Sequence, residues 1–349
     1  MSTISLDYAG NFNRFDTEGM YDQIVSLSDQ INTVYFEMGK SEYAKYYKNI
    51  DKIFICGMGG SAIAGDIVKS LYESKIPIFV IKDYNILDFI DENSLGIVCS
   101  YSGNTAETVS CFDALREKGA QIAMITSGGI LKHFSSEEGY LVKLIPSGFQ
   151  PRAAIGYMFF SLLGILEELG FAKRDEVSVK MMLLNIKQRL QLINKDIPTK
   201  NNMAKKLAEM IFKKVPIIYS SNPKLYPLAY RFKCQINENA KNHAFSNTFS
   251  EMNHNEIEGW EDKSSENLIP VFITDYDENQ KYMDRLDTIK KKFKEEKIEF
   301  LEIRIEGKTI LGKMFSTIMY CDMISYYLAI LNKINPSSIE FIDYLKQNV

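Results

Sequence analysis

Short apolar runs alternate with longer amphipathic stretches along the first half of the chain. The apolar runs, rich in Ile, Val, Phe and Leu, lie at residues 52–57, 77–82, 95–100, 121–126 and 140–145. The stretches between them have helical spacing and lie at 61–74, 105–118 and around 130–135. Apolar strands that alternate with helices predict a parallel sheet covered by helices on both faces.

A second alternation follows a long apolar helix expected at 151–169 and a polar helical connection at 173–200. We expect strands at 215–220, 242–245, 268–274 and 300–305, and helices at 223–240, 280–296, 311–331 and 336–346. The fold class is therefore α/β, with two similar parallel-sheet αβα sandwiches. The expected boundaries are a helical lead-in at 1–34, a first domain at 35–172, and a connecting helix with a second domain at 173–349.

Two serine- and glycine-containing loops follow expected strands of the first domain. They are Gly57-Met-Gly-Gly-Ser61 and Ser100-Tyr-Ser-Gly-Asn-Thr105. A strand-to-helix turn collects unpaired backbone N–H groups and the positive end of a helix dipole, which suits a phosphate. Hydroxyl and amide groups can bind a phosphate monoester without Lys or Arg, so the pair predicts a sugar-phosphate site. The expected binding residues are Gly59, Gly60, Ser61, Ser100, Ser102 and Thr105.

The first loop also has a second interpretation. Gly57, Gly59 and Ala62 match the spacing of a dinucleotide fingerprint, and Asp83 ends the next strand at about the distance of a ribose-binding carboxylate. A dinucleotide site has no use for the second serine loop, so the sugar phosphate is favoured. A purely structural turn is the remaining alternative.

Two further residues suit the chemistry of a sugar phosphate. Glu238, at an expected helix end, is a candidate for the single base that moves a proton between C1 and C2 of an aldose or ketose. Arg152, after a Gly- and Pro-rich corner, is a candidate for stabilising the oxyanion of an enediolate. Each is also compatible with an ordinary exposed charged residue.

His254 and Lys346 complete the set of candidate catalytic residues. His254 lies among acids and amides, a setting that suits proton relay during ring opening; a structural histidine, or a metal site with Glu251 and Glu256, are the alternatives. Lys346 ends the last expected helix, where it either favours the helix dipole or donates to a sugar oxygen.

Composition narrows the class of protein. The net charge of −4 over 349 residues argues against a nucleic-acid binder. The five cysteines form no C-x-x-C pair, which favours free thiols in a reducing, cytoplasmic compartment. The start lacks a signal-peptide pattern, and no stretch approaches 18 uninterrupted apolar residues, so no membrane association is expected.

Together these motifs resemble the bifunctional phosphoglucose/phosphomannose isomerases, in the sugar isomerase (SIS) domain superfamily. The resemblance runs from about residue 35 to the C-terminus. It rests on the two serine loops and on Pro151-Arg-Ala-Ala, Glu238-Asn-Ala-Lys241 and Asn253-His-Asn-Glu-Ile-Glu-Gly-Trp260. It implies two SIS domains and a homodimer that shares its active site.

The resemblance also implies roles for the candidate residues. The enzyme would interconvert fructose 6-phosphate with glucose 6-phosphate and mannose 6-phosphate through a cis-enediol, without a cofactor or metal. The serine-loop hydroxyls would hold the substrate phosphate. Glu238 would shuttle the proton and Arg152 would stabilise the intermediate, while Lys346 and a His254 from the partner subunit would assist ring opening.

The C-terminal stretch departs from the family pattern. Many relatives read Asp-Pro-Thr-Pro where this chain has Asn335-Pro-Ser-Ser338, so the proline that stiffens the helix start is missing. Two other functions stay open from the sequence: a non-catalytic sugar-phosphate-binding SIS regulator, and an isomerase of another sugar phosphate.

Overall fold

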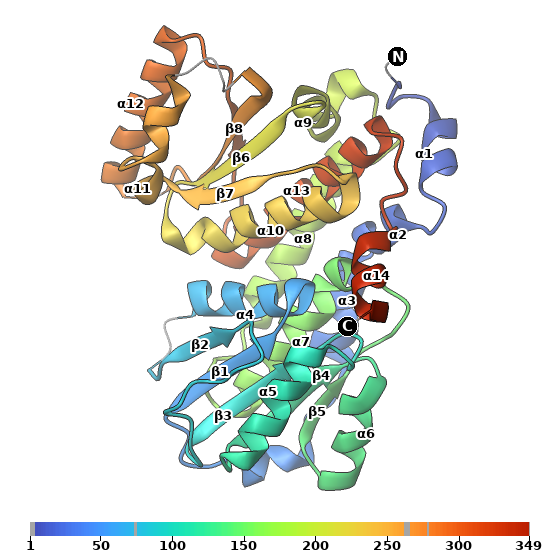
Figure 1. Ribbon diagram of the computed structural model, residues 1–349, viewed down its shortest axis with the longest axis vertical. Helices are drawn as coiled ribbons and strands as arrows, with labels where there is room; N and C mark the ends of the chain where they lie inside the picture. Colours follow the sequence, from blue (N-terminus) through green and yellow to red (C-terminus); the bar gives the residue numbers. More distant parts are fainter. Residues whose placement is uncertain (1–3, 73–74, 262–265, 278, 349) are drawn as a thin grey trace. The chain divides into compact units, whose positions relative to one another are not determined.

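The chain folds into two compact units in the computed structural model, which describes residues 4–72, 75–261, 266–277 and 279–348 (Figure 1). The β1–β5 unit contains Ser26–Asp175. The β6–β9 unit contains the residues up to Val25 and from Glu176 onward. The first 25 residues, expected as part of a lead-in, therefore fold with the C-terminal half of the chain.

The β1–β5 unit has a parallel sheet of order β2-β1-β3-β4-β5. Its strands are β1 Lys52–Gly57, β2 Ile78–Ile81, β3 Ser94–Cys99, β4 Gln121–Thr126 and β5 Leu141–Leu144. Its helices are α3 Leu27–Ile31, η1 Asn32–Glu37, η2 Glu42–Tyr46, α4 Gly59–Leu71, α5 Ala106–Glu117, α6 Gly129–Glu138, η3 Pro151–Ala153 and α7 Ile155–Glu168. The expected strands of this half are confirmed to within one residue at each end.

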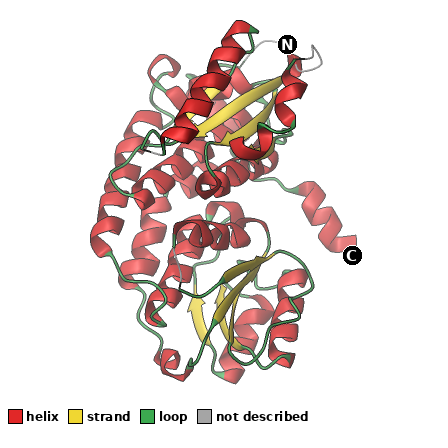
Figure 2. Ribbon diagram, turned by 90° about the vertical axis from the view of Figure 1, so that its left-hand side faces the viewer, coloured by secondary structure: helices red, strands yellow, loops and turns green. Residues whose placement is uncertain are grey.

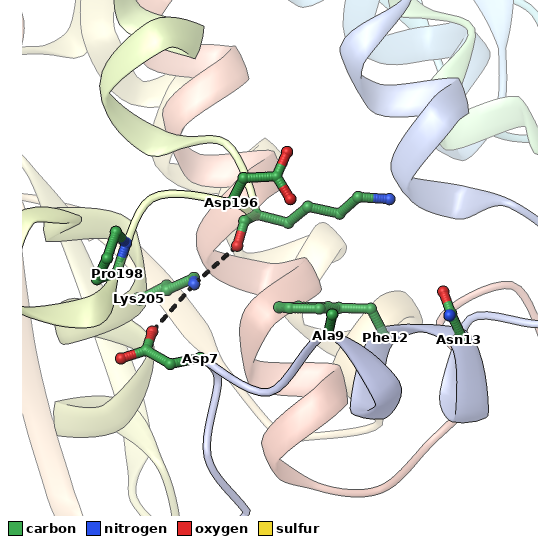
Figure 3. Close-up of a pocket in the computed structure, with 8 residues that line it drawn as sticks. Asp7, Ala9, Phe12, Asn13, Asp196, Pro198 and Lys205 are labelled. Carbon is green, nitrogen blue, oxygen red and sulfur yellow. Dashed lines mark hydrogen bonds and ion pairs between the residues drawn. The ribbon is translucent and has the colours of Figure 1, made fainter.

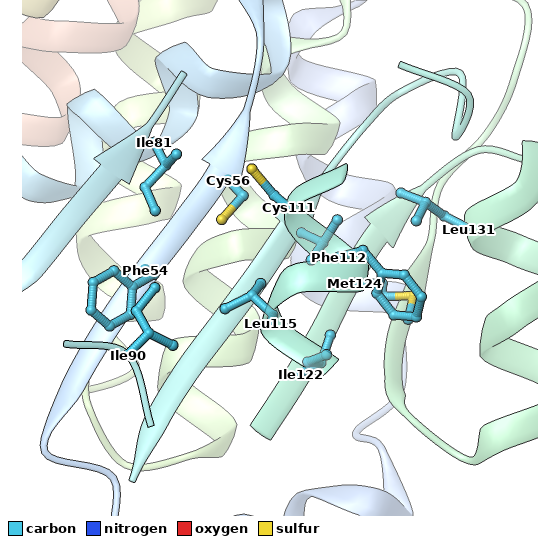
Figure 4. Close-up of a cluster of buried hydrophobic side chains, with 11 residues drawn as sticks. Phe54, Cys56, Ile81, Ile90, Cys111, Phe112, Leu115, Ile122, Met124 and Leu131 are labelled. Carbon is cyan, nitrogen blue, oxygen red and sulfur yellow. The ribbon is translucent and has the colours of Figure 1, made fainter. Parts of the chain in front are cut away.

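Apolar side chains from β1 and α5 form the core on one face of this sheet (Figure 4). Phe54 and Cys56 of β1 are fully buried, and Phe112 of α5 is fully buried in the same cluster. The Phe112 ring stacks on Phe134 with a centroid separation of 5.2 Å. Because β1 and α5 border the two serine loops, this packing holds both loops in place.

The β6–β9 unit has a parallel sheet of order β7-β6-β8-β9. Its strands are β6 Val215–Ser220, β7 Phe245–Thr248, β8 Leu268–Thr274 and β9 Leu301–Arg304. Its helices are α1 Ala9–Phe15, α2 Met20–Val25, α8 Glu176–Ile193, η4 Thr199–Asn201, α9 Met203–Ile211, η5 Pro223–Leu225, α10 Tyr226–Ala240, α11 Phe249–Met252, η6 Glu256–Trp260, α12 Gln280–Glu295, α13 Ile310–Leu331 and α14 Glu340–Asn348. Figure 2 shows the strands of each unit flanked by helices.

Strand β7 differs from the sequence expectation of 242–245. The preceding helix ends at Lys241 in the left-handed region (φ 51°), and the Asn242 side chain then donates to the carbonyl of Lys214 at 2.9 Å. Pairing with β6 therefore begins only at Phe245, opposite Ile217. The polar residues that continue the strand gave no apolar signal in the sequence.

Helix α13 is the central helix of the β6–β9 unit. From Leu311 to Leu331 every residue is buried. By length and composition alone α13 would also pass for a membrane span, but its apolar stretch is wholly buried in the fold. It is therefore the core helix of a folded unit, and it packs against α8, α9 and α10.

Lys205 of α9 attaches the N-terminal segment to this unit (Figure 3). Its Nζ donates to the carbonyl of Leu6 at 2.8 Å, to Asp7 Oδ1 at 3.2 Å and to the carbonyl of Lys195 at 2.9 Å. Burial lowers the pKa of Lys205, although the hydrogen bond and charge of Asp7 oppose this shift. The small cavity of about 270 Å³ beside Lys205 lies at this attachment point.

Replacing Phe112 by alanine should destabilise the β1–β5 unit strongly. The change removes a fully buried ring and leaves a cavity, which costs about 3–5 kcal/mol in the free energy of unfolding. Urea unfolding followed by near-UV circular dichroism would measure it. Phe89→Ala is the control, because that side chain is already 52% exposed and should cost far less. Equal losses in both variants would contradict the assigned core.

Candidate active site

The two serine loops lie side by side at one edge of the β1–β5 sheet. β1 and β3 are neighbouring parallel strands, and the chain leaves β1 toward β2 on one side and returns to β3 on the other. A crevice at such a reversal of strand order is the usual ligand site of an open α/β sheet. The first loop follows β1 and starts α4, and the second follows β3 and starts α5.

One hydrogen bond lies within the second loop, and another joins the two loops. Ser100 Oγ lies 3.0 Å from Thr105 Oγ1, and the backbone N–H of Tyr101 donates to Ser61 Oγ at 3.2 Å. Ser61 and Ser100 are buried, whereas Ser102 is exposed. The N-cap residues of α4 and α5 make no side-chain capping bond, which favours an anion at both helix starts.

Arg152 lies next to the first loop. A Cβ on Gly60 would lie 2.8 Å from the carbonyl oxygen of Pro151 and 2.9 Å from the backbone nitrogen of Arg152. The Arg152 side chain is only 2% exposed, and its Nη1 donates to Gln150 Oε1 at 3.3 Å. This burial excludes the interpretation of Arg152 as an exposed surface residue.

Tyr101 is a site residue that the sequence analysis did not single out. Its hydroxyl donates to the carbonyl of Pro146 at 2.8 Å and accepts from the Phe149 N–H at 2.9 Å, and burial raises the pKa of Tyr101. The side chain thus connects the second serine loop to the corner that leads into Arg152. In the sequence, the signal for this role of Tyr101 was the presence of an aromatic residue inside a loop of serines and glycines.

Glu238 lies on the last turn of α10 and lines a cavity of about 750 Å³ within the β6–β9 unit. His243, Asn335 and Glu340 line the same cavity. Lys241 Nζ donates to the backbone carbonyls of Glu238 and Asn335, so it braces the end of α10. Glu238 is half-buried, which differs from the exposed helix residue that its type alone would suggest.

His254 lies at the other end of the same sheet. Glu238, on the last turn of α10, is near the start of β6, where Asn242 bonds to Lys214, whereas His254 follows β7 and α11 at the opposite end of the strands. The six residues of β6 span roughly 17–20 Å. One copy of this unit therefore does not bring His254 to the cavity of Glu238.

The carboxylates around His254 have partners other than a metal. Glu251 Oε1 accepts from Asn255 Nδ2 at 2.6 Å, and Glu256 Oε2 accepts from Tyr219 OH at 2.9 Å. Within the described ranges, no three His, Cys, Asp or Glu side chains are grouped as metal ligands would be. The geometry thus gives no support to the metal interpretation of this segment.

Lys346 lies on α14, whose described residues are all exposed and which stands apart from the rest of its unit (Figure 2). Ile342, one turn earlier on the same side of α14, lines the cavity of Glu238. The helix starts at Glu340 rather than near 336, because Asn335 Oδ1 accepts the Ser337 N–H at 2.9 Å and holds a turn there.

Family models match both halves of the chain. A SIS domain matches residues 46–136, and the C-terminal SIS domain of bacterial phospho-glucose isomerase matches residues 200–349. The fold is also that of a Thermus thermophilus hypothetical protein, TT0462, with a TM-score of 0.76 and 13% identity over 97% of this chain and 92% of that one. The expected pair of SIS domains is confirmed, so the fold and loops define a two-domain SIS protein.

Sequence relatives give the family. A bifunctional phosphoglucose/phosphomannose isomerase from Caldicellulosiruptor bescii is 36% identical over 337 residues, which cover 95% of this chain and 98% of that protein. A D-glucosamine-6-phosphate 4-epimerase from Sulfolobus acidocaldarius is 34% identical over 227 residues, 65% of this chain and 69% of that one. The chain belongs to the bifunctional phosphoglucose/phosphomannose isomerase family.

Gly60→Ala should disturb the serine loops and Arg152 together. The new Cβ would contact the Pro151–Arg152 backbone at under 3 Å, so one segment must move, at a cost of about 1–3 kcal/mol in stability. We expect a lower Tm and weaker binding of 6-phosphogluconate, a substrate-sized anion that cannot be isomerised, measured by calorimetry. Gly39→Ala is the control, because nothing lies within 4 Å of a Cβ there. Unchanged binding in Gly60→Ala would argue against this loop as the phosphate site.

Proposed function

We propose that this protein is a metal-independent aldose–ketose isomerase that interconverts fructose 6-phosphate with glucose 6-phosphate and mannose 6-phosphate. The observation that carries the proposal is the half-buried Glu238 on the wall of a cavity of about 750 Å³, in a member of this family. That volume is typical of a small-molecule site. A single carboxylate in reach of adjacent sugar carbons is what the reaction requires.

In this proposal the β1–β5 unit holds the phosphate. The hydroxyls of Ser61, Ser100, Ser102 and Thr105 donate to phosphate oxygens, and Gly59 and Gly60 let the backbone approach closely. Ser61 Oγ accepts from the Tyr101 N–H, so its own hydrogen remains to be donated. Partial charges from helix starts and hydroxyls replace a lysine or arginine in this role.

Glu238 carries the proton between C2 and C1. It takes the C2 proton of the open-chain aldose; the C2–H electron pair forms the C1–C2 double bond and the carbonyl pair moves onto O1, which gives the cis-enediol as its enediolate anion. The O2 hydroxyl proton passes to O1, and Glu238 returns its proton to C1 as the carbonyl forms at C2 to give the ketose. Because glucose and mannose phosphates differ only in configuration at C2, they share this intermediate. Proton return to either face of C2 therefore yields both aldoses, while the Arg152 guanidinium stabilises the negative oxygen.

Ring opening is assigned to Lys346 and to the His254 of a second copy in a homodimer. Two observations support a second copy: the β6 strand separates His254 from Glu238 within one unit, and α14 exposes Phe341, Tyr344 and Leu345 by 89%, 64% and 60%. Such an apolar helix face is suited to contact another molecule.

The proposed compartment is the cytoplasm. All five cysteines are free, and four of them are buried: Cys56, Cys99, Cys111 and Cys321. Thiols of this kind persist in a reducing compartment.

A second candidate function is an isomerase or epimerase acting on another sugar phosphate. The relative named as a D-glucosamine-6-phosphate 4-epimerase favours it, because its identity of 34% is close to that of the isomerase relative. Epimerisation at C4 needs chemistry at a carbon remote from C1 and C2, so assays with the two substrates separate these functions.

Wild-type protein in EDTA should convert fructose 6-phosphate into both aldose phosphates, and Glu238→Gln should lower kcat by about 100- to 10,000-fold. The amide keeps the shape of the side chain but accepts no proton, so 6-phosphogluconate should still bind. Separate enzymatic detection of the two aldose phosphates gives the rates. Glu340→Gln is the matched control, an exposed carboxylate on the same cavity. Full turnover in Glu238→Gln would exclude Glu238 as the base.

Two inactive variants should restore activity when they are mixed. If His254 acts across a dimer, Glu238→Gln and His254→Ala chains refolded together form mixed dimers in which one of two sites is native, giving about a quarter of wild-type activity. Chains refolded separately and then combined without exchange are the control. A mixture as inactive as its components would place Glu238 and His254 of each site on one chain, and an active His254→Ala variant would exclude a role for His254.

A further inference from the structure

A row of buried polar side chains joins α10 to α13. On α10, Arg231, Gln235 and Asn239 follow one another at intervals of four residues, and each is no more than 3% exposed. Arg231 Nη2 donates to Asp322 Oδ2 at 2.6 Å, and Asn239 Nδ2 donates to Ser325 Oγ at 2.9 Å. We call these five residues the α10–α13 polar row.

The row continues to the end of α10. Ser325 Oγ donates to the carbonyl of Asp322 at 2.7 Å, and Asn332 Nδ2, at the end of α13, donates to the carbonyl of Ala240 at 2.8 Å. Three bonds thus connect the two helices: one from Arg231, in the first half of α10, and two at its last residues, Asn239 and Ala240. A rotation or one-residue slip of α10 would break these three bonds between the helices.

The position of the Glu238 side chain depends on this alignment of α10 against α13. It lies seven residues after Arg231, which places it on the same side of α10, at the end of the helix. There α13 gives way to Ile334 and Asn335, which line the cavity together with Glu238. A turn of α10 about its axis would therefore carry the Glu238 carboxylate along the cavity wall.

The buried ion pair in the row joins the two helices at a high desolvation cost. Arg231 and Asp322 have side chains that are 4% and 5% exposed, and burial raises the pKa of Asp322 although the guanidinium beside it opposes this change. Apolar residues of similar volume often give equal or greater stability at such positions. A need for stability therefore does not explain a charged pair at this position. A need to fix the orientation of α10 against α13 does, because an ion pair with hydrogen bonds is directional.

We propose that Arg231 and Asp322, with the rest of the polar row, are positioning residues that hold the Glu238 carboxylate at the reacting carbons. This inference rests on the proposed role of Glu238 as the base. The row itself does not reach the substrate. Its effect is to fix the rotation of α10. This matters because displacing a catalytic group by the order of 1 Å lowers the rate about 100-fold.

The test is the double variant Arg231→Met/Asp322→Leu. We expect a Tm equal to or above that of the wild type, an unchanged KM for fructose 6-phosphate, and a kcat about 10- to 100-fold lower. Exchange of solvent deuterium into C2 of glucose 6-phosphate should fall by the same factor, because that exchange reports proton abstraction directly. Arg231→Lys, which keeps the charge, should recover most of the rate.

A buried ion pair of equal exposure provides the control. Lys143 and Glu168 in the β1–β5 unit are 5% and 8% exposed, and Lys143→Met/Glu168→Leu should leave kcat unchanged. Asn239→Leu/Ser325→Ala tests the same helix contact if the first variant does not fold. Wild-type kcat and deuterium exchange in a folded row variant would overturn the proposal. A Glu238→Gln variant that still turns over would instead remove the base on which it rests.

Discussion

The candidate site depends on hydrogen bonds between buried polar groups, because a buried polar group costs least where a partner fixes its direction. The N–H of Tyr101 ties the two serine loops through Ser61, and its hydroxyl holds the corner before Arg152. In the other unit Arg231 and Asp322 set the rotation of α10. In each unit a buried polar contact, together with the apolar packing around it, fixes where a candidate site residue lies.

The two units share a strand order, but different residues lie at the ends of the corresponding strands. β2-β1-β3-β4 has the same connectivity as β7-β6-β8-β9, so β6 and β8 also border a reversal of strand order. There the Asn222 side chain accepts the Leu225 N–H as a cap, and Lys313 is held by Asp275 at 2.8 Å and by Asp277 at 2.6 Å. A phosphate at that edge would meet two carboxylates. Among the described residues, the same topology thus favours an anion at the serine loops of the β1–β5 unit and not beside Asp275 and Asp277.

The sequence predicted those features that depend on local patterns. The β1 and β3 strands and the loops after them follow from apolar runs that end in Gly and Ser, and helix starts at these loops need no tertiary information. Strand β7 was misplaced because its position depends on the bond from Asn242 to Lys214 and on pairing with β6. The burial of Arg152 and the bracing role of Tyr101 likewise arise from contacts between segments distant in sequence.

The arrangement of rigid and exposed elements favours an enzyme over a sugar-phosphate sensor. A sensor needs the phosphate loops and an element that moves, but it has no use for a carboxylate whose direction is fixed by a costly buried ion pair. Glu238 lies at the end of such a registered helix, on a cavity wall. Lys346 is instead on α14, whose described residues are all exposed. Proton transfer between adjacent carbons needs a carboxylate held in the way that Glu238 is held.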